Sequence, residues 1–263
     1  MSSSVTLASW NVNSVRARLD GVLAWLDHAR PDVLCLQETK VENAQFPLQP
    51  FADLGYHIEI YGQKTFNGVA ILSKLPLGDV RFGFGDGPDD PLDQPKRLIS
   101  ATVAGVRVLN LYAPNGQTPD AEAFVFKQHW YARLRRYLET HHRPDEAVLL
   151  CGDFNIAPAD LDVHDPDKLR GTCGFHPDEH TWLNQLMAWG LVDPFRQQHP
   201  GEKAFSWWDY RENSFRRDKG MRIDYILTTP TLAGRCTATA IDRAPRGFEK
   251  PSDHTPVLAT FTA

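Results

Sequence analysis

Two pairs of polar residues stand two positions apart at the ends of apolar runs. Asp153 and Asn155 follow the run in "VLLCGDFNIAP", and Asn11 and Asn13 follow the run in "VTLASWNVNS". Side chains at positions i and i+2 of a β-strand point to the same side, so each pair is expected to project together from a strand end. Such a pair either caps a turn or holds a polar ligand, and a single pair is more often turn chemistry.

Other side chains that could take part in a reaction stand at the ends of further apolar runs. They are Glu38, Tyr112, Asn115, Asp253 and His254. Asp224 lies inside the apolar segment "RIDYILTT", where a buried charge needs a partner and a histidine would serve. If these ends meet at one edge of the fold, the polar groups form a single cleft.

This set of side chains suits metal-assisted hydrolysis of a phosphodiester. Mg²⁺ prefers oxygen ligands and commonly uses one or two carboxylates, a task that fits Glu38 and Asp253, with Asn13 as a weaker contributor. Amides and a tyrosine hydroxyl can hydrogen-bond phosphate oxygens without repelling them. His254 can donate a proton to a phosphoryl oxygen if a carboxylate such as Asp224 orients its other nitrogen.

The elements that must position these groups follow from periodicity and turn signals. Strands are expected within residues 5–14, 32–40, 56–62, 68–73, 97–103, 106–114, 147–155, 222–229 and 251–261. A first helix is expected from a cap at Ser14 to Pro31, a second of about 20 residues after Asp120, and a third from Pro177 to Trp189. The best fit is a four-layer αββα sandwich, two mixed β-sheets face to face with helices outside, in a single domain over 1–263.

Composition narrows the class of protein. The chain has 263 residues, 42% of them hydrophobic, and no run of about 18 apolar residues such as a membrane helix needs. Its start, "MSSSVTLASWNV", does not resemble a secretory signal, so an unexported, cytoplasmic protein without membrane contact is expected. The spacing of the four cysteines favours neither a disulfide framework nor a zinc site.

Charge is distributed unevenly along the chain. The net charge of −5 argues against a protein that coats nucleic acid by bulk electrostatics. Residues 210–222 nevertheless carry five basic and two acidic side chains, a local charge of +3. The acid-rich segment 82–95 is expected to be a solvated surface loop.

Seven segments, in order, resemble the exonuclease III family of abasic-site DNA endonucleases, within the endonuclease/exonuclease/phosphatase superfamily. They are "SWNVNSVRAR", "LCLQETK", "LNLYAPNG", "CGDFNIAP", "FSWWDY", "GMRIDYIL" and "SDHTPV". The resemblance implies a four-layer sandwich and Mg²⁺-dependent cleavage of DNA 5′ to an abasic site, with Mn²⁺ as a substitute. It also implies removal of nucleotides or blocking groups from 3′ ends, double-stranded DNA as partner, and a monomer.

The resemblance also implies roles for individual residues. Glu38 corresponds to the principal metal ligand, with Asn13 and Asp253 near it. Some relatives carry Asp where this chain has Asn13, which makes the metal site here less negative. Asp153 corresponds to the residue that aligns or deprotonates the attacking water, and Asn155 to its neighbour on the scissile phosphate.

The remaining implied contacts surround the phosphate. Tyr112, Asn11 and Asn115 correspond to phosphate-side contacts. Asp224 and His254 correspond to a pair in which the histidine stabilises the charge that develops on phosphorus. The resemblance leaves open whether Asp153 or His254 is the formal base.

The expected substrate pocket lies in the later segments. Trp207 and Met221 correspond to residues that line the abasic-sugar pocket, since a deoxyribose without its base presents an apolar face. Adjacent aromatics are mostly core residues, and this interpretation is preferred for Trp208. Arg216 and Arg217 are candidates for backbone phosphate contacts.

Three features keep alternatives open. Arg222 either contacts phosphate or pairs internally. His176 and His180 have the spacing of zinc ligands on a helix, but an exposed first turn is the preferred interpretation because no third ligand is evident. The loop 159–181, with Gly171 and Gly174, is expected to influence the balance of endonuclease and exonuclease activity.

Two other functions compete with the DNA endonuclease. A phosphatase or phosphodiesterase for a small-molecule or lipid phosphoester would keep the same catalytic residues. Trp207 and the basic segment 210–222 favour DNA over that substrate. A catalytically silent DNA-binding module is disfavoured because every expected catalytic position holds a competent residue.

Overall fold

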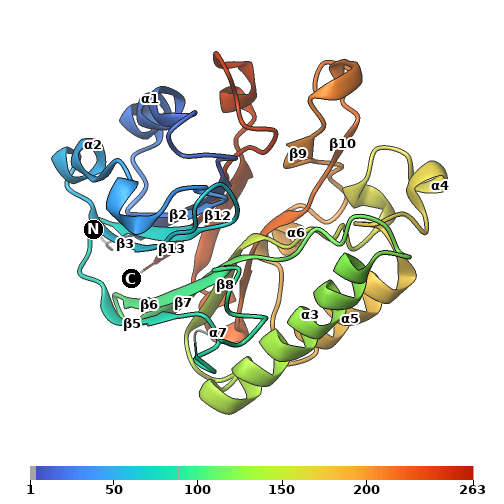
Figure 1. Ribbon diagram of the computed structural model, residues 1–263, viewed down its shortest axis with the longest axis horizontal. Coiled ribbons are helices and arrows are strands. Elements are labelled where there is room, and N and C mark those ends of the chain that lie inside the picture. The colour runs from blue at the N-terminus through green and yellow to red at the C-terminus, as the bar shows by residue number, and fades with distance from the viewer. Residues whose placement is uncertain (1–3, 88, 263) are drawn as a thin grey trace.

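Two β-sheets carry the strands whose ends bear the polar residues (Figure 1). The computed structural model describes residues 4–87 and 89–262. The six-stranded first sheet has the order β12 (Cys236–Ile241), β13 (Val257–Thr262), β1 (Ser4–Asn11), β2 (Val33–Gln37), β4 (Val69–Ser73) and β3 (His57–Tyr61). The five-stranded second sheet has the order β11 (Asp224–Thr228), β8 (Val148–Asp153), β7 (Val106–Tyr112), β6 (Leu98–Val103) and β5 (Gly78–Phe82).

Both sheets are mixed, as the sequence predicts. In the first sheet β1 pairs with β2 in parallel and with β13 in antiparallel orientation. In the second sheet β7 and β8 are parallel, while β8 and β11 are antiparallel. The parallel pairs bring the carboxyl ends of β1 and β2, and those of β7 and β8, to the same edge of their sheets.

Helices cover the outer faces of the sandwich. In Figure 1, α1 (Leu19–Ala29) and α2 (Leu48–Asp53) lie over the first sheet, and α3 (Glu122–His141) and α5 (Pro177–Met187) lie over the second. Shorter helices are α4 (Pro166–Leu169), α6 (Pro194–Gln198) and α7 (Pro230–Ala233), and single 3₁₀ turns span Asn43–Gln45, Asp160–Asp162, Arg211–Asn213 and Ala244–Gly247. Within the described residues, no helix is long and apolar enough to cross a membrane.

The unbroken apolar runs of the sequence are strands buried on both faces. In β2, Val33 and Cys35 face the core between the two sheets, whereas Leu34 and Leu36 face the core beneath α1. The strand β8 does the same with Leu149 and Cys151 on one side and Leu150 on the other. Because neither side of these strands meets water, apolar and polar residues do not alternate along them. The resulting three apolar cores establish the four layers.

The start of the first helix differs from the prediction. Ser14 does not cap it, because α1 begins at Leu19 and its cap residue is Arg18. Ser14 has a φ of 87° and its carbonyl accepts from the backbone N–H of Arg18, so residues 14–18 form a separate turn. The polar residues at the end of β1 are thus followed by irregular backbone.

Several strands were not predicted. The edge strands β5 and β12 expose much of their surface and lack a clear apolar face. A short hairpin of β9 (Trp207–Trp208) and β10 (Gly220–Met221) also escaped prediction, because its strands have only two residues each. All four cysteines are free, and Cys35 and Cys151 are buried, which agrees with the interpretation of the sequence.

Candidate active site

The polar strand ends meet in one cavity of about 280 Å³ at the edge where β2, β7 and β8 end and β11 begins. Its wall consists of Glu38, Tyr112, Asn115, Asp153, Asn155, Cys173, Gly174, Trp207, Met221, Ile223, Asp253 and His254. Residues far apart in the sequence, such as Glu38 and Asp153, therefore share one site. We call this space the catalytic cavity.

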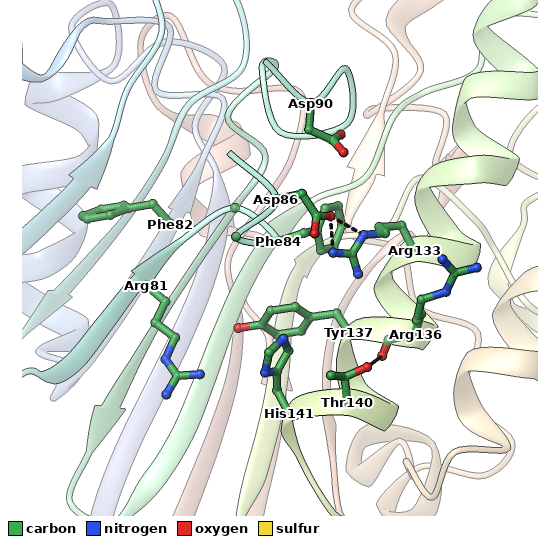
Figure 2. A pocket seen from close by; sticks show the side chains of 12 residues that line it. Arg81, Phe82, Phe84, Asp86, Asp90, Arg133, Arg136, Tyr137, Thr140 and His141 are labelled. Carbon is green, nitrogen blue, oxygen red and sulfur yellow. Dashed lines mark hydrogen bonds and ion pairs between the residues drawn. The ribbon is translucent and has the colours of Figure 1, made fainter. Parts of the chain in front are cut away.

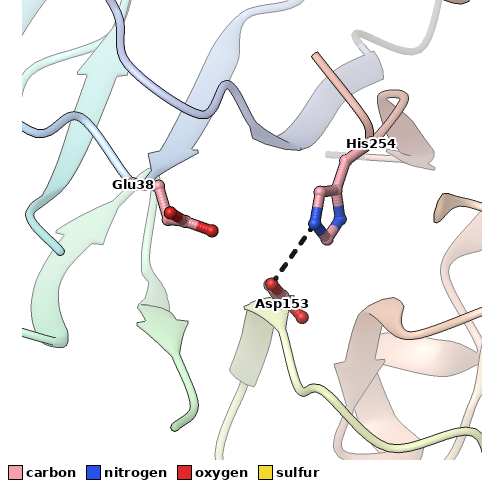
Figure 3. Close-up of side chains that lie close together, drawn as sticks. All are labelled: Glu38, Asp153 and His254. Carbon is pink, nitrogen blue, oxygen red and sulfur yellow. Dashed lines mark ion pairs between the residues drawn. The ribbon is translucent and has the colours of Figure 1, made fainter. Parts of the chain in front are cut away.

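A buried chain of charged groups lies at the centre of the catalytic cavity. His254 Nδ1 lies 2.9 Å from Asp224 Oδ2, and the opposite nitrogen, Nε2, lies 3.6 Å from Asp153 Oδ2. Figure 3 shows His254, Asp153 and Glu38 converging from different strand ends. Asp224 also accepts a hydrogen bond from Ser206 Oγ at 2.6 Å. The partner that the buried Asp224 needs is His254, as the sequence suggested.

The two groups that face each other both have raised pKa values. The pKa of the Asp153 carboxyl is about 7: burial raises it most, the charges of Asp224 and Glu38 raise it further, and the charge of His254 opposes them. Burial alone would lower the pKa of His254, but the carboxylates of Asp224 and Asp153 outweigh it and raise the value to about 10. At neutral pH the imidazole is charged, and the Asp153 carboxyl is close to its own titration point.

Asn11 holds two of the carboxylates in place from below. Its Nδ2 donates to Glu38 Oε1 at 2.8 Å and to Asp153 Oδ2 at 2.9 Å. Lys40 Nζ lies 2.8 Å from the other oxygen of Glu38. Asn11 is fully buried and does not line the cavity, so the predicted contact between Asn11 and the substrate phosphate stays a prediction.

The oxygen atoms around Glu38 suit a hard divalent cation. Among the described residues, one group of His, Cys, Asp and Glu could hold a metal ion, and it joins Glu38, Asp153 and His254, with ligand atoms within 4.8 Å of one another. Asn13 and Asp253 lie next to this group: Asn13 Nδ2 donates to Asp253 Oδ1 at 3.0 Å, and Asn13 Oδ1 accepts from Lys40. Carboxylate and amide oxygens are the donors that Mg²⁺ prefers, so the residues present fit such an ion.

The end of β8 and the turn that follows it are part of the site. Gly152 has a φ of 139°, and a Cβ there would lie 1.8 Å from the carbonyl oxygen of Leu111, so only glycine fits between β8 and β7. The Asp153 carboxylate accepts from the backbone N–H of Asn155, which has a φ of 53°. Asn115 Nδ2 in turn donates to Asn155 Oδ1 at 3.1 Å. The turn therefore presents Asp153 and Asn155 to the same cavity.

Tyr112 has a neighbour that the sequence did not reveal. The guanidinium of Arg97 lies over its ring, 4.5 Å from the centroid. Burial and the charge of Glu38 raise the pKa of the Tyr112 hydroxyl well above its usual value, so the hydroxyl keeps its proton and remains a hydrogen-bond donor. Arg97 directly precedes β6, and no sequence motif marks it as a site residue. It lies next to Tyr112 because β6 pairs with β7.

One side of the catalytic cavity is apolar. Trp207 and Met221 face each other across the β9–β10 hairpin, and Ile223 continues the same wall. Gly174 completes it, and a Cβ added there would lie 3.3 Å from Met221 Cε. Trp208 is fully buried, as expected of a core residue.

The basic segment 210–222 divides into paired and unpaired cations. Arg211 pairs with Asp209, and Lys219 lies 3.5 Å from Glu212. Arg216 and Arg217 are exposed, line no cavity wall of the catalytic site, and form no ion pair with any other described residue.

Arg222 and the two histidines have structural partners. Arg222 is buried and lies 2.5 Å from Asp162 and 2.7 Å from Asp193, so it pairs internally. His176 caps α5 and accepts from the N–H of Asp178, while His180 Nε2 lies 3.0 Å from the carbonyl of Ala157. Both histidines are half-buried rather than exposed, and each has a structural contact of its own.

A second and larger cavity, of about 680 Å³, lies between the loop after β5 and the second half of α3. Figure 2 shows Arg133 and Arg136 beside Tyr137 and His141 in it, with Asp86 bonded to Arg133. Arg81, which also lines it, lies 2.9 Å from Asp79. We call this space the outer cavity.

Comparison with known proteins connects the geometry to a family. Residues 8–254 match the model of the endonuclease/exonuclease/phosphatase family. Exodeoxyribonuclease III of Haemophilus influenzae is 40% identical over 96% of this chain and 98% of its own length. An AP endonuclease from Archaeoglobus fulgidus has 43% identity and a TM-score of 0.94, covering 98% of this chain and 100% of that one. A 3′ phosphatase from Neisseria, solved with a product DNA hairpin, has 41% identity and a TM-score of 0.93 over the same shares.

Proposed function

Because the chain belongs to the endonuclease/exonuclease/phosphatase family, we propose that it is a DNA-repair phosphodiesterase that cleaves the backbone 5′ to abasic sites. Its similarity to an exodeoxyribonuclease, an AP endonuclease and a 3′ phosphatase supports a hydrolase of DNA that also trims or cleans 3′ ends. We further propose that residues 1–263 act as one catalytic domain, as a cytoplasmic monomer on double-stranded DNA.

The observation that carries the proposal is the pairing of Asp153 with His254. A carboxyl with a pKa of about 7 beside an imidazole with a pKa of about 10 gives an acceptor of protons and a stable positive charge in one cavity. Asp153 accepts the proton of the attacking water, and the imidazolium of His254 stabilises the negative charge that develops on the phosphoryl oxygens. Asp224 keeps the imidazole oriented and charged through Nδ1.

The remaining residues bind the substrate and an ion. Glu38, with Asn13 and Asp253 beside it, would hold Mg²⁺ or Mn²⁺, and the bound ion would polarise a phosphoryl oxygen. Asn155, Asn115 and Tyr112 offer neutral donors to the phosphate. The resemblance implies Asp in some relatives where this chain has Asn13, so a bound ion would meet fewer negative charges here.

The apolar wall favours an abasic sugar over the alternative substrates. Trp207, Met221 and Ile223 offer an aromatic and aliphatic surface to a deoxyribose without its base. The exposed Arg216 and Arg217 are placed on the same β9–β10 connection, where they can meet backbone phosphates. A small-molecule or lipid phosphoester would use neither feature, and the similar proteins are named for their action on DNA.

Three labelled duplexes test the proposal. The purified protein is incubated with Mg²⁺ and an abasic, an intact blunt-ended or a 3′-phosphate-ended duplex, and the product lengths are resolved. We expect a single cut 5′ to the abasic site, slower shortening of the blunt end, and loss of the 3′ phosphate, all abolished by EDTA. Hydrolysis of a small phosphomonoester without cleavage of any duplex would refute the proposal.

A further inference from the structure

A buried ion pair lies behind the catalytic cavity, outside the residues that line it. Lys127 on α3 and Glu179 on α5 are both 0% exposed, and Lys127 Nζ lies 2.5 Å from Glu179 Oε1. Charged residues are rarely buried so completely unless they are paired, because removing a charge from water costs free energy. The other hydrogen bonds of Lys127 and Glu179 therefore indicate the role of the pair.

The three protons of the Lys127 ammonium have three acceptors. Besides Glu179, Nζ donates to the backbone carbonyls of Asn155 at 2.7 Å and Asn115 at 3.0 Å. These are the two residues whose side-chain amides join each other in the catalytic cavity. Asn155 has a positive φ of 53°, a conformation that most side chains avoid, and its carbonyl is held by Lys127.

The Glu179 carboxylate holds a second segment of the same cavity. Its Oε2 accepts from the backbone N–H groups of Gly174 at 2.6 Å and His176 at 3.1 Å. Gly174 contributes to the wall beside Met221. One ion pair thus fixes three backbone segments, around residues 115, 155 and 174, that come from different parts of the chain.

We propose that Lys127 and Glu179 are positioning residues that set the amides of Asn115 and Asn155 and the Gly174 wall for the reaction. Neither side chain lines the catalytic cavity, so their effect passes through these backbone segments. A buried ion pair adds little stability relative to an apolar pair of similar size, so the specific consequence of the pair is orientation of these segments. The kinetic part of this inference rests on the proposed function, because the amides matter only if they meet a phosphate.

The test uses the full chain with Lys127→Met/Glu179→Leu, which removes both charges and leaves neither one stranded. We expect a folded protein with a lower melting temperature, because four backbone groups lose their partners, together with a kcat on the abasic duplex lower by about tenfold and a KM changed by less than about threefold. The single variant Lys127→Arg keeps the positive charge and several hydrogen-bond donors, so it is expected to retain most of the parent's kcat.

Arg107→Met is the matched control: it removes a buried cation that contacts Asp79 and Ser100, and it should lower the melting temperature with kcat unchanged.

Hydrogen exchange gives a readout that needs no activity. Loss of the carboxylate should make the amides of Gly174 and His176 exchange about tenfold faster, with the central strands unaffected. A folded double variant with kcat within twofold of the parent and unchanged exchange at these amides would overturn the inference. If the double variant does not fold, Lys127→Met/Glu179→Gln, which removes both charges and keeps an oxygen acceptor, takes its place; kcat should still fall, because the carbonyls of Asn115 and Asn155 lose Lys127, while exchange at Gly174 and His176 should change less. If the parent cleaves no duplex, the proposed function fails, and hydrogen exchange alone decides whether the pair positions these segments.

Discussion

The catalytic cavity and the region beside the outer cavity hold two histidines in opposite electrostatic surroundings. His254 is enclosed by the carboxylates of Asp224 and Asp153, which raise its pKa to about 10. His142 directly follows α3, next to His141 of the outer cavity, and its pKa is lowered to about 4, first by burial and then by the charges of Arg107 and Arg81. One histidine is therefore kept charged and the other neutral in the same molecule.

This contrast shows that size does not identify the reactive site. The outer cavity is larger, about 680 Å³ against about 280 Å³, but two of its arginines, Arg81 and Arg133, have Asp79 and Asp86 as partners near the surface. In the catalytic cavity, Asp153 and His254 are buried and face each other. The carboxyl of Asp153 has a pKa of about 7, whereas the imidazole of His254 has a pKa of about 10 and keeps its proton. His142 is strongly shifted as well, so the distinguishing feature of the catalytic cavity is that two shifted titrating groups face each other in it, as is typical of a reactive site.

The largest effect is expected for Asp153→Asn. The amide keeps the shape of the side chain but cannot accept a proton from water, so kcat on the abasic duplex should fall by about 10³-fold or more. Binding of the duplex, measured by fluorescence anisotropy without metal, should change by less than about threefold. Unchanged turnover would contradict the role assigned to Asp153.

A change at Glu38 should be smaller and depend on metal. Glu38→Gln removes the charge that would hold the ion, so the Mg²⁺ concentration for half-maximal rate should rise by about tenfold or more. Excess Mg²⁺ should restore part of the rate. A loss of rate that added metal does not influence would argue against a ligand role for Glu38.

The apolar wall is tested at Gly174. Gly174→Leu places a side chain against Met221, so cleavage of the abasic duplex should fall by about tenfold. Gly171→Leu is the matched control, because Gly171 has a similar φ of 84° but no atom within 4 Å of an added Cβ. Both variants carry the same backbone strain, and only the first narrows the cavity. Equal effects of the two would show that strain, rather than the wall, is responsible.

The smallest effect on activity is expected in the outer cavity. Arg136→Ala removes an exposed arginine from its wall, and kcat on the abasic duplex should stay within about twofold of the parent. A larger loss, with the melting temperature unchanged, would mean that the two cavities cooperate.

The outer region should instead influence stability in acid. Between pH 6.5 and about 4 the unfolded chain binds a proton at His142 that the native chain does not, so the free energy of unfolding should fall as pH falls through this window. The slope from this group is on the order of 1 kcal/mol per pH unit. Urea unfolding of the parent and of His142→Phe checks this, and the variant should lack that part of the slope. Parallel profiles would contradict the shift.

The sequence revealed most of the fold because its buried strands have simple patterns. The runs at β2 and β8 are apolar on both faces, and the polar residues after them mark the edge of the sheets. The edge strands β5 and β12 were missed because solvent, rather than a core, meets much of their surface. Ser14 looked like a helix cap because local composition cannot distinguish a cap from an earlier turn.

The site was predictable in its residue types but not in its supporting contacts. Asp224 and His254 could be paired from the sequence because a buried carboxylate needs a partner. Lys127 and Glu179 are 52 positions apart, and no local pattern links them. Their contact depends on how α3 and α5 pack over the second sheet, which periodicity does not specify. The fixed position of Asn11 beneath two carboxylates likewise depends on the alignment of both sheets.

The most direct test of the account is the protonation state of His254 in the metal-free protein. Nitrogen NMR of histidine-labelled protein at pH 8 should show the ring of His254 with both nitrogens protonated, titrating near pH 10. His142, in the same sample, should be neutral and serve as an internal reference. A neutral His254 at pH 8, with a pKa at or below 6.5, would contradict the claim that carboxylates hold a positive charge in the catalytic cavity.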